Sequence, residues 1–343
     1  MYGFWELLVR PALEAADARE VVEVGSEGGR HTLRLLEWCA ARGARLHVIE
    51  PEPGYDPDEL AAAHRDCLVF HRATSLEALA GIARVDAVLL DGDHNWYTVF
   101  HELKSIATSH GRDFPLVLLH DVAWPFARRD MYYAPARIPG EARQAYMQGG
   151  LRRGEPKVLP YDGLSPELFK AIEEGGPRNG VRTAIEDFIR ESPLPLRFEI
   201  VPVDFGLGFL ATETLLSKRP ALRALLDGLG DPAFREKLLL HLEERRIDDL
   251  VPLHSDNAKL RNSLEWTVAD LGRHQAELAR HEVEVKRLRE MLARAIGDAQ
   301  GSAARAAELD ARVAALLSSR SWRVTEPLRR VGALLRGRRT GAP

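Results

Sequence analysis

Carboxylates and imidazoles follow two short apolar runs of the sequence, at the points where those runs end. Asp91, Asp93 and His94 come after the first run, and His120 and Asp121 come after the second. Hard cations such as Mg²⁺ prefer carboxylate oxygens, so two or three of the aspartates could hold one. A bound dication would lower the pKa of a substrate hydroxyl, and either histidine could then accept its proton. A structural alternative stays open, in which Asp93 caps the following helix and His120 is a hydrogen-bonded core residue.

Glycines mark the end of an earlier apolar run, just after Glu23. Gly25 and Gly29 would let a ligand approach the backbone, and the helix that follows would offer free N–H groups. The second glycine of the dinucleotide fingerprint G-x-G-x-x-G is replaced by Glu27, whose carboxylate would crowd a pyrophosphate. The turn therefore favours a cofactor without phosphate that carries a ribose and a charged amino-acid part. A purely structural turn is the alternative.

The next apolar run ends in an acidic residue, Glu50. An acid at this point of a nucleotide-binding fold can accept hydrogen bonds from both ribose hydroxyls. A solvated strand end is the alternative, and Glu52 is close enough to take the same role. The glycine turn and this acid together indicate a nucleoside-bearing cofactor, without distinguishing a methyl donor from a nicotinamide.

The elements around these residues alternate between short apolar runs and helix-length amphipathic segments, which predicts parallel strands joined by crossover helices. We expect strands at residues 20–24, 45–50, 67–71, 85–90 and 115–120. We expect helices near residues 31–41, 56–65, 75–83 and 95–110. The predicted fold class is α/β, a doubly wound Rossmann-like sheet, and such sheets bind ligands at the carboxyl edge of their strands.

Two features follow the fifth predicted strand. Residues 124–179 are rich in Pro, Gly, Arg and Tyr, and we expect a lid or acceptor-binding insertion with one short helix at 166–173; a disordered insertion is the alternative. A helix at 180–190 and two apolar runs at 198–203 and 206–211 then predict an antiparallel hairpin that closes the sheet. The first domain is therefore assigned to residues 1–215.

The remaining chain is expected to be helical. Residues 216–257 predict a short helical linker, and residues 258–318 predict a coiled coil, with Gly297 and Gly301 interrupting it. Apolar residues recur at intervals of seven, at Leu264, Leu271, Leu278, Val285 and Leu292. Self-association through this coil is the expected role, and a long solvated helix packed on its own domain is the alternative.

Residues 319–343 form a basic tail in which arginines alternate with apolar residues. Such a stretch can lie on an anionic membrane surface, which predicts peripheral contact at the inner face of a membrane. Residues 319–329 are similar to a tail motif of bacterial cell-surface polysaccharide enzymes. A disordered solubilising tail is the alternative.

Composition narrows the function classes. A net charge of −4 over 343 residues argues against duplex nucleic acid as a partner. Cys39 and Cys67 lack ligand-like spacing, which excludes a disulfide framework and a thiolate zinc site. No apolar run approaches the roughly 20 residues of a membrane span, and the N-terminal segment lacks the pattern of a signal peptide. We therefore expect a cytoplasmic protein.

The motifs taken together resemble a known family. The pattern Glu23-x-Gly25-x-x-x-Gly29, an acid ending the second strand, Asp-Gly-Asp-His after the fourth and His-Asp after the fifth resemble the class I S-adenosylmethionine-dependent methyltransferases. The chain is most similar to the bacterial branch that contains sugar and small-molecule O-methyltransferases, over about residues 19–214. The resemblance implies a seven-stranded methyltransferase sheet with a terminal antiparallel hairpin.

The resemblance also implies roles in cofactor binding. Glu23, Gly25 and Gly29 would surround the methionine part of S-adenosyl-L-methionine, Glu50 would bind its ribose, and Ser75 would lie near the adenine. Acids that end the fourth and fifth strands bind Mg²⁺ in metal-dependent relatives.

Those acids correspond here to Asp91, which would also contact the cofactor, and Asp121, with Asp93 as a third candidate. Family members often carry an asparagine or a second acid after the fifth-strand acid, where this chain has Val122.

The expected activity is O-methylation of a hydroxyl on a sugar or glycan intermediate, as in polysaccharide biosynthesis. An activated sulfonium methyl needs an oxygen nucleophile held in line with the C–S bond and a group that manages its proton. The acceptor contacts are expected from three arginines and three aromatic residues of the insertion, namely Arg128, Arg129, Arg178, Trp124, Tyr132 and Tyr133. Two alternatives are a nicotinamide-dependent oxidoreductase and a non-catalytic scaffold that acts through its coil.

Overall fold

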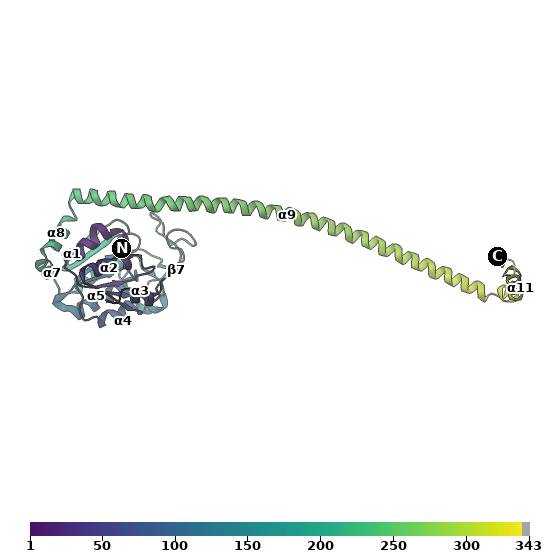
Figure 1. Cartoon of the computed structure of the whole chain (residues 1–343), viewed down its shortest axis with the longest axis horizontal. Coiled ribbons are helices and arrows are strands. Elements are labelled where there is room, and N and C mark those ends of the chain that lie inside the picture. Colours follow the sequence, from purple (N-terminus) through teal and green to yellow (C-terminus); the bar gives the residue numbers. More distant parts are fainter. Residues whose placement is uncertain (338–343) are drawn as a thin grey trace. The chain divides into compact units, whose positions relative to one another are not determined.

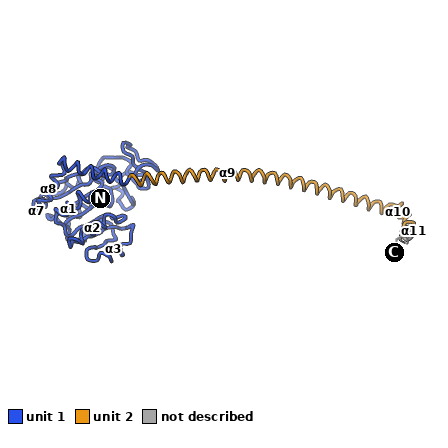
Figure 2. Tube along the Cα trace, turned by 45° about the horizontal axis from the view of Figure 1, so that its top comes forward, with its two compact units in different colours: residues 1–249 blue, residues 250–343 orange. Residues whose placement is uncertain are grey.

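The computed structural model describes residues 1–337, and it divides the chain into two compact units, Met1–Asp249 and Leu250–Pro343 (Figure 2). The candidate site lies in the first unit, which is built around one large sheet. The helix α9 (Pro232–Ser318) begins in the first unit and continues into the second (Figure 1).

Seven strands form the large sheet, in the order β3-β2-β1-β4-β5-β10-β9. The first five strands of this order pair in parallel, and β10 pairs antiparallel with both β5 and β9. The bounds are β1 Glu20–Val24, β2 Arg45–Ile49, β3 Leu68–His71, β4 Ala87–Leu90, β5 Leu116–His120, β9 Leu196–Val201 and β10 Leu207–Thr212. The predicted doubly wound sheet with a terminal antiparallel hairpin is confirmed.

Helices cover both faces of this sheet. Successive strand residues point to opposite faces, so Val21 of β1 packs into one hydrophobic core and Val22 into the other. Leu35 of α2 closes the first core, and Leu103 of α5 and Ile185 of α6 close the second. The helices between the strands are α2 Arg30–Arg42, α3 Pro57–Ala63, α4 Ser75–Ala78, α5 Trp96–His110 and α6 Val181–Glu191.

The N-terminal segment contributes three short helical elements for which the sequence analysis gives no assignment. They are η1 (Tyr2–Phe4), η2 (Trp5–Val9) and α1 (Arg10–Ala15). Phe4 and Leu8 are fully buried in the first core. This segment therefore belongs to the fold of the first unit.

The insertion between β5 and α6 folds into a second, antiparallel sheet. Its strands are β6 (Met131–Tyr132), β7 (Tyr146–Gln148) and β8 (Phe169–Ala171), in the order β6-β8-β7. The predicted helix at 166–173 is wrong, because β8 occupies its centre. Pairing with two neighbouring strands, and burial of Lys170 with its ammonium bonded to the carbonyls of Ser165 and Leu168, outweigh the local helix propensity.

The first unit extends beyond the predicted boundary at residue 215. Helices α7 (Glu213–Lys218) and α8 (Pro220–Gly228) follow β10, and Leu222 and Leu226 of α8 are buried in the first core. The segment that we expected to be a linker is therefore largely part of the compact unit, which ends at Asp249.

The described residues of the second unit, 250–337, are almost entirely helical. The prediction that Gly297 and Gly301 interrupt the long helix is wrong, because α9 runs without a break to Ser318. A glycine in a helix costs about 1 kcal/mol relative to alanine, which the surrounding Ala, Arg, Glu and Leu residues can offset. Helices α10 (Arg320–Val324) and α11 (Glu326–Gly337) follow.

Part of the predicted basic tail, residues 338–343, lies outside the described residues. None of the helices within residues 1–337 combines the length and apolar character that crossing a bilayer requires.

Candidate functional site

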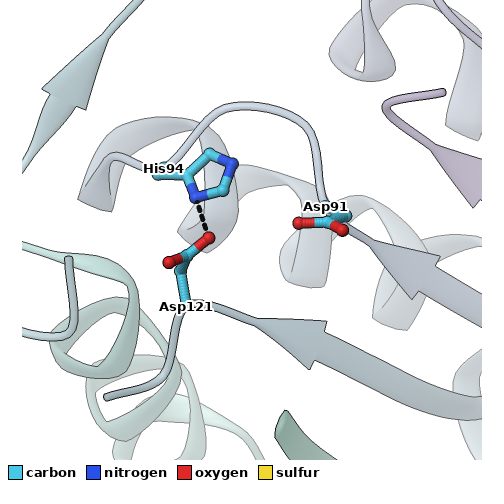
Figure 3. A group of neighbouring side chains, drawn as sticks. All are labelled: Asp91, His94 and Asp121. Carbon is cyan, nitrogen blue, oxygen red and sulfur yellow. Dashed lines mark ion pairs between the residues drawn. The ribbon is translucent and has the colours of Figure 1, made fainter. Parts of the chain in front are cut away.

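Two adjacent strand ends bring carboxylates and an imidazole together at the carboxyl edge of the sheet. Leu90 of β4 pairs with Leu119 of β5, so the residues that follow the two strands are close. One potential ligand atom from each of Asp91, His94 and Asp121 lies within 4.8 Å of the other two (Figure 3). The juxtaposition expected from the strand ends is therefore present for these three residues.

Both histidines form ion pairs within this cluster. Nδ1 of His94 lies 2.5 Å from Oδ2 of Asp121. Nδ1 of His120 lies 3.0 Å from Oδ1 of Asp91 and 3.1 Å from Oδ2 of Asp121. The amino group of Met1 lies 2.7 Å from Oδ2 of Asp91. Asp121 thus sits between two imidazoles, and both carboxylates are balanced by positive groups.

The electrostatics of the cluster favour the charged form of its members. Burial by itself would lower the pKa of His120, but the charge of Asp91 and hydrogen bonds to both aspartates raise it to about 10. Burial by itself would raise the pKa of Asp121, but the charges and hydrogen bonds of His94 and His120 lower it to about 2. The pKa of His94 is raised in the same way by Asp121, against the effect of burial.

The two histidines of the cluster differ in the contacts of Nε2, the ring nitrogen that does not bind an aspartate. Nε2 of His120 lies 3.2 Å from the carbonyl oxygen of Asp204, so both of its nitrogens contact protein atoms. His94 is bonded through Nδ1 and presents Nε2 on the opposite side of its ring (Figure 3). His94 is therefore the better placed of the two to exchange a proton with a ligand.

Asp93, the third predicted metal ligand, is engaged elsewhere. Its Oδ2 accepts a hydrogen bond of 3.2 Å from the hydroxyl of Thr98, in the first turn of α5. Asn95 is the N-cap of that helix, since its side chain accepts from the Thr98 amide. The expected metal role of Asp93 is not supported by this arrangement, because the start of α5 uses its carboxylate.

The two predicted glycines hold the backbone in conformations that side chains rarely adopt. Gly25 has a φ of +84°, and a Cβ there would lie 2.3 Å from the carbonyl oxygen of Asp91. Gly29 has a φ of +76°, and a Cβ would lie 3.1 Å from the ring of Tyr55. Close approach of the β1 and β4 ends thus requires glycine at position 25, in addition to any role toward a ligand.

Glu50 lies directly beside this glycine turn. Its Oε2 accepts hydrogen bonds from the amides of Ser26 and Glu27, at 3.0 and 3.2 Å, and its Oε1 accepts from the amide of Glu52 at 3.0 Å. These bonds fix the carboxylate at the junction of the first two strand ends. Both lone-pair sites of Oε2 are used, and Oε1 has one further site for a ligand hydroxyl.

Glu23 has a buried carboxylate, and one of its two oxygens lacks a hydrogen-bond partner among the described residues. Its side chain is 1% exposed, and Oε1 lies 2.8 Å from Nδ1 of His31. Oε2 has no hydrogen-bond partner within the described part of the chain. An unsatisfied buried carboxylate oxygen is costly, so this atom is suited to a donor group of a ligand. The sequence analysis did not identify His31 as its partner.

Ser75 is buried at the start of α4, near Glu102 of α5. Burial raises the pKa of Glu102 to about 8, and its Oε1 has no hydrogen-bond partner among the described residues. The sequence analysis missed Glu102. Its helical spacing from Val99 and Ile106, both on the buried face of α5, was the signal that could have found it.

Two of the arginines predicted to contact the acceptor bind other parts of the protein instead. Arg129 is 1% exposed and donates hydrogen bonds to the carbonyls of Ala171, Ile172 and Pro156, so its expected contact with an acceptor is wrong. Arg128 is ion-paired with Glu186. The insertion needs the hydrogen bonds of Arg129 because its irregular backbone would otherwise leave buried carbonyls unsatisfied.

Of the remaining residues predicted to contact the acceptor, some pack within the protein and one lies beside the cluster. Tyr132 is buried, and its hydroxyl donates to Asp130 at 2.8 Å. Arg178 lies over the ring of Trp96, with its guanidinium carbon 5.2 Å from the ring centroid. Tyr133 is 55% exposed, and its ring centroid lies 6.4 Å from that of His94. Tyr133 is therefore the predicted acceptor residue that lies beside the cluster, whereas Trp124 is half-buried in the second core.

The sequence analysis also missed Asp130, a buried residue whose carboxylate accepts hydrogen bonds from three segments around the insertion. Its Oδ1 accepts hydrogen bonds of 2.7 Å from the amides of Trp96 and Gly180, and its Oδ2 accepts from Tyr132. It therefore ties the insertion to the starts of α5 and α6.

A family model described as a methyltransferase domain matches residues 22–122. This stretch is methyltransferase-like. It spans the glycine turn, Glu50 and the whole Asp91–His94–Asp121 cluster. Among curated proteins, no relative matches the chain.

Several solved structures are similar to this chain. A methyltransferase from Podospora anserina bound to S-adenosylhomocysteine has 16% sequence identity and a TM-score of 0.35, with 62% of this chain and 78% of that chain covered. A 1,6-didemethyltoxoflavin-N1-methyltransferase from Burkholderia thailandensis has 16% identity and a TM-score of 0.33, with 59% of this chain and 76% of that chain covered. Human N-acetylserotonin methyltransferase has 13% identity and a TM-score of 0.32, covering 59% and 50%.

Proposed function

We propose that this protein is an S-adenosylmethionine-dependent methyltransferase that acts on a hydroxyl oxygen of a sugar or glycan intermediate. The observation that carries the proposal is the arrangement within the methyltransferase-like residues 22–122. Glu23, the glycine turn and Glu50 lie at the ends of β1 and β2, and the Asp91–His94–Asp121 cluster lies at the ends of β4 and β5. One edge of the sheet thus offers groups for a nucleoside and groups that handle a proton.

The residues present fit the cofactor. The open Oε2 of buried Glu23 would accept a hydrogen bond from the ammonium of its amino-acid part. Glu50, held by three backbone amides, would accept from a ribose hydroxyl through Oε1. When bound, S-adenosylmethionine supplies a sulfonium methyl that is activated for in-line displacement by an oxygen.

His94 is the residue that we assign to the proton of the acceptor hydroxyl. The base is the neutral imidazole: its Nε2 would take the proton, while Asp121 accepts from Nδ1–H and stabilises the imidazolium that forms, as the acid does in a Ser-His-Asp triad. Tyr133 would pack against the acceptor beside His94. His120, whose two nitrogens both contact protein atoms, would hold Asp91 and Asp121 in position and not act as a base.

The same cluster fits a divalent cation. Asp91 and Asp121 offer carboxylate oxygens and His94 an imidazole nitrogen, from loops that follow two different strands. A bound cation would lower the pKa of the acceptor hydroxyl. A given complex can use the ring of His94 either as a metal ligand or as a base.

Calorimetry with S-adenosylhomocysteine and NAD tests the cofactor, and a matched pair of variants tests the site. Glu50→Gln should weaken S-adenosylhomocysteine binding by roughly 10- to 100-fold, as expected for hydrogen bonds to a charged group. Glu52→Gln should leave the affinity unchanged, because Glu52 is exposed and pairs with Arg137. Binding of NAD in place of S-adenosylhomocysteine would refute the proposal. A panel of nucleotide sugars with labelled cofactor then tests the acceptor class.

A further inference from the structure

An apolar stripe with a heptad repeat runs along α9 in the second unit. With Leu264 at position a of a heptad repeat, a single register spans residues 253–316. The a positions are Asn257, Leu264, Leu271, Leu278, Val285, Leu292, Ala299, Ala306 and Val313. The d positions are Leu253, Leu260, Thr267, His274, His281, Leu288, Ala295, Ser302, Leu309 and Leu316. Fourteen of these nineteen residues are Leu, Val or Ala.

The glycines of this part of α9 lie on the other faces of the helix. Gly272, Gly297 and Gly301 fall at positions b, f and c, so none of them leaves a gap at a or d. Pro252, the proline inside α9, precedes the first d residue. The helix is therefore continuous where the stripe needs it to be.

The stripe is exposed in the isolated chain. Leu264, Leu278 and Leu292 are 64%, 63% and 61% exposed. Most helices in water depend on packing of an apolar face for their stability. Among the described residues of the second unit, no segment covers the apolar stripe of α9. A repeat of 3.5 residues favours a second helix wound around the first.

We propose that residues 253–316 form a parallel, in-register, two-stranded coiled coil with the same residues of a second copy. Asn257 carries the first argument for this geometry. A single asparagine at an a position favours a dimer with its counterpart asparagine opposite, at a cost in stability. A shift by one heptad in either direction would place Asn257 opposite a leucine, Leu250 or Leu264.

Charges beside the stripe carry the second argument. In a parallel dimer, each g residue faces the e residue five positions later in the other copy. In register, three facing pairs have opposite charge and one pair has like charge; the first three are Asp256–Arg261, Glu284–Arg289 and Arg305–Asp310, and the fourth is Glu277–Glu282. In register, each of these pairs occurs twice by symmetry. In a dimer shifted by one heptad, the g residues of one copy face e residues twelve positions later, and those of the other copy face e residues two positions earlier. Two pairs then have opposite charge, Glu277–Arg289 and Arg312–Asp310, and three have like charge, Asp270–Glu282, Asp298–Asp310 and Glu284–Glu282. The in-register dimer is therefore favoured by charge complementarity.

Cysteine cross-linking of the full chain tests the geometry. Native Cys39 and Cys67 are buried, so the wild type provides a low background. Leu264→Cys, at position a, should form a covalent dimer under mild oxidation, because the two cysteines would face each other. Glu265→Cys, at position b, is the matched control and should stay uncross-linked. Equal cross-linking of both variants, or none at position 264, would overturn a parallel in-register pairing.

Sedimentation equilibrium tests the association itself. The wild type should show twice the 38.3 kDa mass of one chain. Leu271→Lys, at position a, should shift it to the mass of one chain, whereas Val283→Lys, at the outer f position, should leave it a dimer. A wild type that sediments as a single chain at micromolar concentration would refute the coil, whatever cofactor the first unit binds.

Discussion

Nδ1 of His94 lies 2.5 Å from Oδ2 of Asp121, although the two residues follow different strands of the sheet. Pairing of β4 with β5 creates this contact, because it aligns the ends of the two strands. An imidazole held by a buried carboxylate is both oriented and made more basic. The contact therefore links the fold directly to the chemistry that we propose.

Replacing His94 should separate chemistry from binding. His94→Gln removes the base that takes the proton from the substrate hydroxyl, so the rate of methyl transfer should fall by roughly 10²- to 10⁴-fold. The affinity for S-adenosylhomocysteine, measured by calorimetry, should stay within a few-fold of the wild type. His64→Gln, which lies at the end of α3 and has no part in the cluster, is the control. Full activity of His94→Gln would contradict the assignment of the base.

Divalent cations should stabilise the first unit through the cluster. Mg²⁺ or Mn²⁺ at about 100 times its Kd would add roughly 2.7 kcal/mol to the free energy of unfolding, seen as a higher Tm. Asp91→Asn and Asp121→Asn should abolish this response. Asp93→Asn should keep it, because the Asp93 carboxylate is bonded to Thr98 and lies outside the cluster. A Tm that does not respond to any divalent cation, with turnover undiminished by chelation, would argue against the metal.

Glu102 should make stability depend on pH. Its pKa is about 8 in the fold, against an ordinary value of 4.5, so the folded state retains a proton that the unfolded state releases. The free energy of unfolding should therefore fall as pH rises from about 4.5 to 8.

Glu102→Gln removes this penalty and should be more stable than the wild type at pH 8, by on the order of 1 to 4 kcal/mol. The difference should vanish below pH 4.5. Urea unfolding at several pH values measures it, with exposed Glu37→Gln as the control. A difference that does not vary with pH would show that Glu102 is ionised in the fold.

Arg129 should matter for stability and Arg128 much less. Arg129→Met leaves buried carbonyls in the insertion without donors, so the free energy of unfolding should fall by about 3 kcal/mol. Arg128→Met breaks a partly exposed ion pair with Glu186, which is worth about 1 kcal/mol or less. Urea unfolding of both variants tests the assignment. Equal losses would indicate that the buried hydrogen bonds of Arg129 are not the reason.

The glycine turn should tolerate a side chain at one glycine and not at another. Gly25→Ala would force a Cβ against the Asp91 carbonyl at a positive φ, so we expect a loss of several kcal/mol, on the order of 3. At Gly28 a Cβ would meet open space, so Gly28→Ala should be nearly neutral. Thermal unfolding compares the two variants. A stable Gly25→Ala protein would show that the two strand ends are free to move apart.

The large sheet could be predicted because its signals are local. Apolar runs such as 20–24 and 115–120 give strands, and the alternating helices give parallel pairing, so Asp91 and Asp121 were expected at one edge. The insertion could not be predicted in this way. Its β8 strand exists only because β6 and β7 lie on either side of it, and Arg129 is buried only because the surrounding carbonyls need its donors.

By itself the sequence determined the strand ends that carry acids and histidines, the glycine turn after the first strand and the heptad repeat of the long helix. These features depend on residue type and spacing along one segment. Only the tertiary structure decided that Asp121 lies between two imidazoles, that Asp93 turns to Thr98, and that the N-terminal helices complete the core. Side-chain partners depend on which distant segments pack together, and local spacing does not contain that information.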